Sequence, residues 1–170
     1  GRAAPACPIE DTVVIAGTGR SGSTWLGEML RGVRGYKYLN EPFMDTPLRR
    51  RTYLNPERVA PEPIQEYVHR ALTGQIWRSW KWRFEANTSA GMLYEFTSRR
   101  KVVVKFTRAL RMIRWMRRHF LVRGAILLVR HPCAVISSML RHGGGWHEDH
   151  LQNLGDSPTA QVFGRNLPEE

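Results

Sequence analysis

The chain has 170 residues, with 26 Lys and Arg against 15 Asp and Glu and a formal charge of +11. This length suits one domain with a buried core, and a hydrophobic fraction of 42% with 24% charged residues excludes a disordered or fibrous chain. No apolar run approaches the roughly 20 residues that cross a membrane, and two cysteines, Cys7 and Cys133, make neither a disulfide framework nor, without ligand spacing, a zinc site.

The basic excess is almost entirely arginine, because only four of the 26 basic residues are lysines. An anionic partner is one explanation, since converging arginines focus a positive potential. A solvated basic surface is the other. Nucleic acid, anionic glycans and phosphate-bearing cofactors all satisfy the first explanation, so composition does not choose among them.

The predicted elements begin after a loose lead-in, residues 1–11. Residues 12–16 are a short β-branched run that predicts a buried strand. A glycine-rich turn follows, and then a helix in which five apolar side chains share one face: Trp25, Leu26, Met29, Leu30 and Val33.

Residues 37–61 are rich in turn-forming residues and contain Asn40-Glu41-Pro42 and an arginine run over 49–51. The next pattern predicts a helix opened by Pro61 and Pro63 and capped by Gly74, and then a helix over 90–99. A buried strand over 101–106 follows, and after it a basic amphipathic helix whose inward residues are Leu110, Ile113, Met116 or Arg117, and Phe120. The last predicted elements are a strand over 125–129 and a helix from Pro132 to Arg141.

Strands that alternate with helices predict an α/β fold, in which a P-loop-like parallel sheet is covered by helices on both faces, giving three layers. We divide the chain into the lead-in 1–11, a core over 12–142 and an irregular C-terminal segment over 143–170. Ligands of such sheets bind beyond the carboxyl ends of the strands. The glycine-rich turn and Arg130 both lie at that edge, which predicts one shared site.

The turn Gly17-Thr-Gly-Arg-Ser-Gly22 has the G-x-x-x-x-G spacing of a phosphate-binding loop. Its glycines let successive backbone N–H groups face an anion, and the following helix adds its positive dipole end. Loops that hydrolyse ATP or GTP carry Lys directly after the last glycine, where this chain has Ser23. Neither later strand ends in the Asp that helps to hold Mg²⁺, so a nucleotide hydrolase is disfavoured.

Arg130 follows the last predicted strand, and Ser138 lies eight residues later in the next helix. A guanidinium at a strand end and a helix hydroxyl can bind one phosphate together, the arginine bidentately. Alternatively, Arg130 pairs with a surface carboxylate and Ser138 is an ordinary helix residue.

Together, VVIAGTGRSGSTWL and ILLVRHPCAVISSML resemble the 5′-phosphosulfate loop and the 3′-phosphate segment of sulfotransferases, closest to the carbohydrate-type and related bacterial members. The family commonly has Asp-Pro after the segment's arginine, where this chain has His131. The family continues well past this segment, whereas only residues 143–170 remain here. The chain is thus a truncated form, lacks segments, or is a minimal member.

The resemblance implies transfer of a sulfuryl group from 3′-phosphoadenosine 5′-phosphosulfate (PAPS) to a hydroxyl of a carbohydrate or small molecule, without metal. It places the cofactor against Gly19, Arg20, Ser21, Gly22, Ser23, Thr24, Trp25, Arg130 and Ser138. Arg20 and Lys105 are the predicted catalytic cations. Glu41, in YLNEP, matches the proposed base, and the alternative is a surface carboxylate beside a turn proline. Arg108 lies at the same predicted edge.

Two clusters have competing interpretations. His142, His147 and His150 with Glu148 and Asp149 lie in a glycine-rich loop without ligand spacing, which favours a solvated loop over a metal site. The aromatic residues Trp77, Trp80, Trp82 and Phe84 are expected to be core with nearby cations, and stacking on an acceptor is the alternative.

Two other function classes remain open. The first is a P-loop kinase or NTPase-like protein without its lysine, and the second is a basic nucleic-acid-binding domain, which scattered arginines and the lack of a known motif disfavour. We expect no nucleic-acid partner and no membrane span. The expected location is the cytoplasm if the protein is bacterial, and the alternative is a luminal domain with its anchor removed.

Overall fold

The computed structural model describes residues 6–43, 62–76, 82–107 and 109–141. The chain divides into two units, Gly1–Val129 and Arg130–Glu170. The described part of the second unit contains helix α5 (Pro132–Arg141), which begins at the proline predicted to open it. No helix among the described residues is long and apolar enough to span a lipid bilayer.

A five-stranded sheet forms the centre of the first unit. Its strands lie in the order β3-β2-β4-β1-β5, and their bounds are β1 (Val13–Gly17), β2 (Tyr36–Asn40), β3 (Trp82–Arg83), β4 (Lys101–Phe106) and β5 (Gly124–Leu128). All neighbours pair in parallel except β3, which is antiparallel to β2. Because β1 lies between β4 and β5, the turn that follows β1 emerges at the carboxyl edge beside the ends of both.

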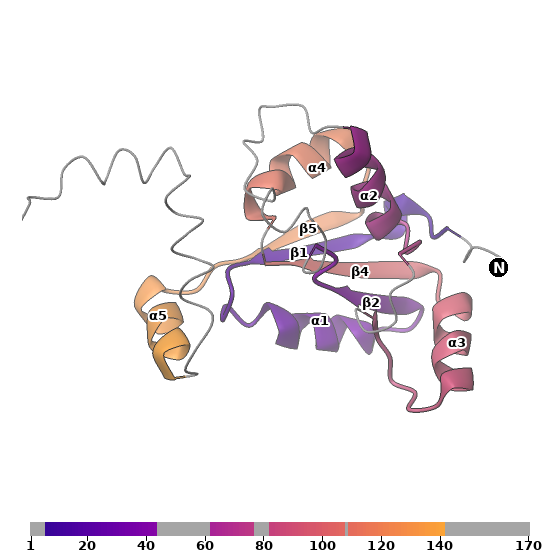
Figure 1. Ribbon diagram of the computed structural model, residues 1–170, viewed down its shortest axis with the longest axis horizontal. Helices are drawn as coiled ribbons and strands as arrows, with labels where there is room; N and C mark the ends of the chain where they lie inside the picture. Colours follow the sequence, from indigo (N-terminus) through magenta and orange to yellow (C-terminus); the bar gives the residue numbers. More distant parts are fainter. Residues whose placement is uncertain (1–5, 44–61, 77–81, 108, 142–170) are drawn as a thin grey trace, which may run out of the picture. The chain divides into compact units, whose positions relative to one another are not determined.

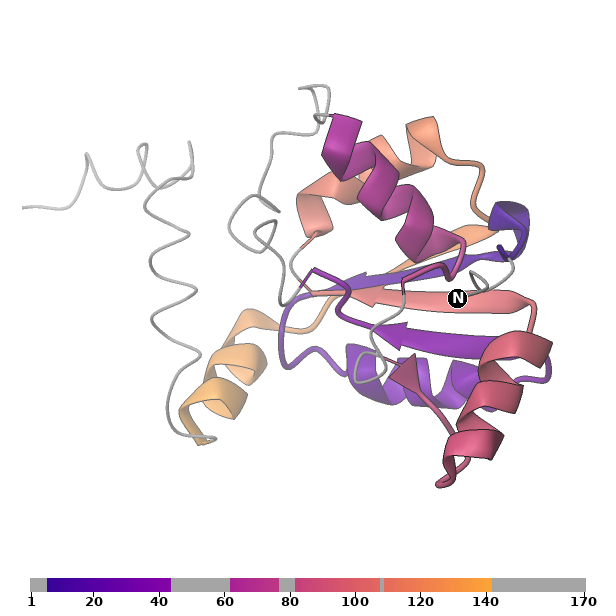
Figure 2. The same ribbon diagram turned by 45° about the vertical axis from the view of Figure 1, so that its right-hand side comes forward.

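Helices cover both faces of this sheet (Figures 1 and 2). Helix α1 (Ser23–Arg31) lies on one face, and α2 (Glu62–Leu72) and α4 (Ile113–His119) lie on the other. The remaining elements are α3 (Ser89–Ser98) and the single 3₁₀ turns η1 (Ile9–Asp11) and η4 (Leu110–Met112). The predicted three-layer α/β fold is confirmed.

The C-terminal end of α2 follows from a glycine cap that the sequence displays. Gly74 adopts a left-handed φ of 70° after the helix, and its N–H donates to the carbonyl of Ala71. The next N–H, of Gln75, reaches back to the carbonyl of Arg70. This pair of bonds satisfies carbonyls that the helix end leaves open, and a positive φ costs glycine little. The predicted cap is confirmed.

The two faces of the sheet bury very different amounts of side chain. The larger core lies under α2 and α4 and includes Phe106, Trp115 and Met116, so Met116 rather than Arg117 is the inward residue of α4. The smaller core, under α1, has Ile15, Tyr38 and Val103 at its centre, with Leu26 and Leu30 packed on it.

The packing of α1 differs from the prediction that five apolar residues share its buried face. Leu26 and Leu30 contact the smaller core, whereas Trp25, Met29 and Val33 are exposed. The helix approaches the sheet through a glycine, and the side chains flanking that narrow contact turn to solvent. The segment over 37–61, which the sequence marks as turn-rich, begins within a strand, since residues 36–40 form β2.

Gly27 sets how closely α1 approaches β2. A Cβ atom at this position would overlap the ring of Tyr38, which is completely buried in the smaller core. The Tyr38 hydroxyl in turn donates to Asn40 Oδ1 at 3.1 Å, so displacing the ring would move a polar contact at the carboxyl end of β2.

We expect Gly27→Ala to lower the free energy of unfolding by about 1–3 kcal/mol, because overpacking forces the ring or the helix to move. Alanine favours a helix by up to about 1 kcal/mol over glycine, so a net loss reports the clash. Gly124→Ala is the matched control, because no atom of the described residues lies within 4 Å of its added Cβ. Urea unfolding of both variants measures the difference, and equal stability of the two would contradict the close contact.

Lys37 explains why the pattern of apolar residues does not predict β2, because a lysine stands at a buried position of this strand. This lysine is only 2% exposed, and it stands between two tyrosines in the strand. Its ammonium donates to the carbonyl oxygen of Phe96 at 3.0 Å and lies over the rings of Phe96 and Trp82, at 4.3 and 5.2 Å. A buried cation is stabilised by such ring faces and a carbonyl, and burial lowers the pKa of Lys37 from its usual 10.5.

This lowered pKa predicts a pH dependence of stability. Between the folded pKa and 10.5 the unfolded chain binds more protons at Lys37 than the folded one, so the free energy of unfolding contributed by this residue rises with pH. In Lys37→Met that contribution is absent. Unfolding titrations of the two proteins between neutral pH and 10.5 should therefore diverge, and parallel profiles would contradict a pKa lowered by burial.

Candidate functional site

The turn between β1 and α1 has the geometry of an anion cradle. The N–H of Ser21 donates to the carbonyl of Thr18 at 3.2 Å, which closes a tight turn. Gly22 follows with φ of 95° and supplies no side chain to cap the helix. The first N–H groups of α1 therefore point out of its end without a side-chain cap, as at phosphate-binding helix ends.

Ser21 adds an unusual polar group to this turn. Its hydroxyl oxygen is buried and has no hydrogen-bond partner among the residues that the structure describes. A Cβ on Gly17 would lie 2.6 Å from that oxygen, so the glycine at the end of β1 leaves room for it. A buried, unsatisfied hydroxyl costs about 1–3 kcal/mol, and an anion oxygen bound in the turn would satisfy it. The residues present thus fit a phosphate or phosphosulfate group.

Lys105, near the end of β4, is the centre of a buried polar cluster. Its side chain is 6% exposed, and its ammonium lies 2.8 Å from Thr24 Oγ1, 3.1 Å from Asn40 Oδ1 and 3.2 Å from Glu41 Oε1. One cation therefore joins the first turn of α1, the end of β2 and the end of β4. The predicted catalytic lysine lies against the predicted phosphate loop.

Glu41 is held as firmly as the lysine it pairs with. Both its carboxylate oxygens accept from the N–H of Thr107, each at 3.1 Å, and its own N–H donates to the carbonyl of Lys105 at 3.0 Å. The side chain remains 13% exposed. An oriented carboxylate that keeps access to solvent fits a proton acceptor, and its ion pair with a buried lysine distinguishes Glu41 from a fully exposed surface carboxylate.

The two residues after Glu41 are held in place by contacts with α2 and β4. The carbonyl of Pro42 accepts from the Tyr67 hydroxyl at 2.6 Å, and the Phe43 ring lies 5.8 Å from that of Tyr67 and 5.1 Å from that of Phe106. Aromatic contacts at these separations favour one defined arrangement. Helix α2 and strand β4 thereby fix the direction from which Glu41 enters the site.

Backbone strain singles out two of the predicted catalytic residues. Among the described residues, the non-glycine residues with positive φ are Arg20, at 66°, and Glu41, at 50°. Such a conformation costs of order 1 kcal/mol or more, and it persists where surrounding structure enforces it, often at functional sites. Both strained residues belong to the set that sequence reasoning selected.

The structure brings together some predicted site residues and leaves others separate. Thr24, Glu41 and Lys105 are in contact, and the rest of the loop lies in the same turn and helix end: Gly19, Arg20, Ser21, Gly22, Ser23 and Trp25. Arg130 and Ser138 belong to the second unit, where Ser138 is half-buried in α5 and Arg130 is exposed just before it. Their role at this site stays a prediction.

Sequence reasoning missed Asn40 and the N–H of Thr107, which complete the cluster. Asn40 ends β2, and the register pairs it with Lys105. Had the strand been recognised, the rule that ligands bind at the carboxyl ends of parallel strands would have selected Asn40. A backbone N–H such as that of Thr107 leaves no signal in a residue type.

Two clusters from the sequence have different outcomes. Trp82 is a core residue whose indole N–H donates to the carbonyl of Ile76 at 2.9 Å, and Phe84 packs beside it, which confirms the expected core role for these two. Trp77 and Trp80 lie outside the described residues, as do Arg108 and the cluster over 142–150. Within the described ranges, no three metal-ligating side chains gather.

We expect Lys105→Met to lower the free energy of unfolding by roughly 3–5 kcal/mol, because it leaves the largely buried Glu41 carboxylate without its cation. Combined with Glu41→Gln, the double variant should lose less than the sum of the two single losses. The matched control is Arg123→Gln, which removes the exposed ion pair with Asp11 and should cost no more than about 1 kcal/mol. Additive losses in urea unfolding would contradict the pairing of Lys105 with Glu41.

Comparison of the chain with protein-family models, with curated proteins and with solved structures gives no match.

Proposed function

We propose that the protein is a sulfotransferase that moves a sulfuryl group from PAPS to a hydroxyl of a carbohydrate or small molecule. The observation that carries this proposal is the contact of Lys105 with both Thr24, at the end of the anion cradle, and the oriented carboxylate of Glu41. The Lys105 ammonium and the Glu41 carboxylate lie side by side next to a loop that lacks the lysine of nucleotide hydrolases, and in this proposal they act as the cation and the base.

The loop has the groups needed to hold a phosphosulfate without metal. The backbone N–H groups at the start of α1 and the buried Ser21 hydroxyl supply donors, and Arg20 supplies a cation that can bind bidentately. In this proposal they hold the 5′-phosphosulfate of PAPS in line with the acceptor oxygen. Such positioning can lower the activation free energy well below that of the bimolecular reaction in water.

The transfer exchanges one S–O bond for another. The acceptor oxygen bonds to sulfur, the bond between sulfur and the bridging phosphate oxygen breaks, and Glu41 takes the proton of the acceptor hydroxyl. Negative charge then develops on the leaving phosphate oxygen, where the Lys105 ammonium and Arg20 stabilise it. Because Lys105 pairs with Glu41 at 3.2 Å, protonation of this carboxylate weakens its hold on the ammonium and frees Lys105 for the leaving oxygen.

The 3′-phosphate is what separates PAPS from ATP, and in the proposal Arg130 and Ser138 bind it. Support comes from their spacing, since α5 places Ser138 in its second turn while Arg130 precedes the helix. A guanidinium bound bidentately to phosphate contributes about 1.5–3 kcal/mol.

We expect adenosine 3′,5′-bisphosphate to bind more tightly than ATP in calorimetric titration, and Arg130→Ala to weaken the bisphosphate about tenfold or more with little effect on ATP. Arg141→Ala, at the other end of α5, is the matched control and should bind both as the parent does. Tighter binding of ATP, with Mg²⁺ present, would favour a kinase-like protein instead. An unchanged bisphosphate affinity in Arg130→Ala would remove this residue from the site.

We expect Glu41→Gln to lower turnover by about 10²–10⁴-fold while the affinity for adenosine 3′,5′-bisphosphate is kept, because the amide cannot take a proton. Transfer of labelled sulfate from PAPS to a panel of sugars and small alcohols measures the turnover. Glu66→Gln, an exposed carboxylate on α2, serves as the control. Near-normal turnover in Glu41→Gln would exclude Glu41 as the base.

A further inference from the structure

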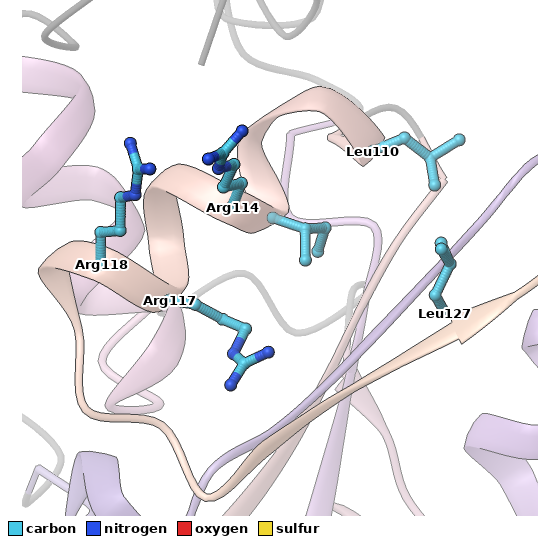
Figure 3. A pocket seen from close by; sticks show the side chains of 6 residues that line it. Leu110, Arg114, Arg117, Arg118 and Leu127 are labelled. Carbon is cyan, nitrogen blue, oxygen red and sulfur yellow. The ribbon is translucent and has the colours of Figure 1, made fainter. Parts of the chain in front are cut away.

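A groove of about 520 Å³ lies between α4 and the edge strand β5, apart from the cradle described above (Figure 3). Its lining consists of three aliphatic and three cationic side chains: Leu110, Ile113, Leu127, Arg114, Arg117 and Arg118. The volume is in the range of about 300–1,000 Å³ that is typical of small-molecule sites.

The cationic half of the groove is built on one helix. Arg114, Arg117 and Arg118 are spaced three and four residues apart, which places them on the same exposed face of α4. Figure 3 shows the Arg117 side chain extending from the helix toward the strand side of the groove. Within the part of the chain that the structure describes, no carboxylate forms an ion pair with any of these three guanidinium groups.

The aliphatic half lies along the edge of the sheet. Leu127 of β5 is 58% exposed although it belongs to a strand, and Leu110 and Ile113 flank it from η4 and the start of α4. Burying a leucine fully stabilises by about 1.5–3 kcal/mol relative to leaving it in water. The three side chains form an apolar strip directly beside the three arginines of α4.

We propose that this groove binds a single-chain amphiphilic anion, an aliphatic chain that carries a carboxylate, sulfate or phosphate head. The chain lies against Leu110, Ile113 and Leu127, and the head bonds to the arginines of α4. Both halves are needed to explain the lining: a purely ionic ligand would leave the aliphatic strip in water, and a neutral apolar one would desolvate three guanidinium groups without compensation.

Nucleic acid fits this surface less well than the amphiphile does. A phosphate backbone requires a continuous run of cations and offers its sugars and bases, rather than an alkyl chain, to the strip beside them. The groove also lies on the opposite face of the sheet from α1, since Leu127 lines it together with α4, whereas Lys105 contacts Thr24 of α1. The inference is therefore independent of the proposed sulfuryl transfer, and either can fail alone.

The test is calorimetric titration of the full chain with octanoate below its micelle concentration, compared with acetate, 1-octanol and vesicles of phosphatidylglycerol. Saturable binding of octanoate, with weaker binding of acetate and of octanol, is expected. Arg114→Gln, Arg117→Gln and Arg118→Gln combined should weaken octanoate at least about tenfold. Leu127→Ser should weaken it by a few-fold while leaving acetate unaffected.

Two controls separate this site from general charge and from misfolding. Combined Arg34→Gln, Arg70→Gln and Arg100→Gln removes the same charge from exposed residues outside the groove and should bind octanoate as the parent does. Circular dichroism should show that both triple variants keep the parent's helix content. Equal affinities for acetate and octanoate, binding to vesicles alone, no saturable binding, or an equal loss in the control triple variant would each overturn the proposal.

Discussion

The structure around the candidate site depends on one buried ammonium group. Lys105 extends from β4 between the first turn of α1 and the end of β2, and its three oxygen partners come from both of those segments. A buried cation is tolerable only when every proton it carries finds an acceptor. Its solvation therefore requires Thr24, Asn40 and Glu41 to meet at one point, and that requirement positions the β1–α1 turn relative to Glu41.

The same constraint explains where the backbone is strained. Glu41 adopts its positive φ while its N–H and its carboxylate both bond to the backbone of β4, at Lys105 and Thr107. Arg20 adopts its positive φ inside the tight turn that presents the loop N–H groups. In both residues the cost of the conformation is offset by contacts that direct polar groups toward the carboxyl edge. The strain thus marks the edge at which ligands of parallel sheets bind.

Much of the fold can be read from the sequence because the pattern of burial matches the residue types. The runs TVVIA and KVVVKF become β1 and β4, and Gly74 caps α2 through the backbone conformation that glycine permits. Strand β2 does not show such a match, because Lys37 is buried among aromatic rings. These rings belong to Trp82 and Phe96, which lie far from Lys37 in the sequence, so the residues around Lys37 do not predict its burial. The buried face of α1 is mistaken for a similar reason, since its contact is made by Gly27 rather than by the largest apolar residues.

The charge of +11 also has a clearer meaning once the residues are located. Arg20 and Lys105 lie at the candidate transfer site, and the arginines of α4 line a separate groove on the other face of the sheet.

The most direct test of the central claim, that the β1–α1 turn and Lys105 form one anion site, is a titration of ¹⁵N-labelled protein with adenosine 3′,5′-bisphosphate followed by amide chemical shifts. We expect saturable shifts at Gly19, Ser21, Gly22, Thr24 and Lys105, with the signals of α3 unchanged. Shifts that avoid the turn, or equal shifts with unphosphorylated adenosine, would contradict it.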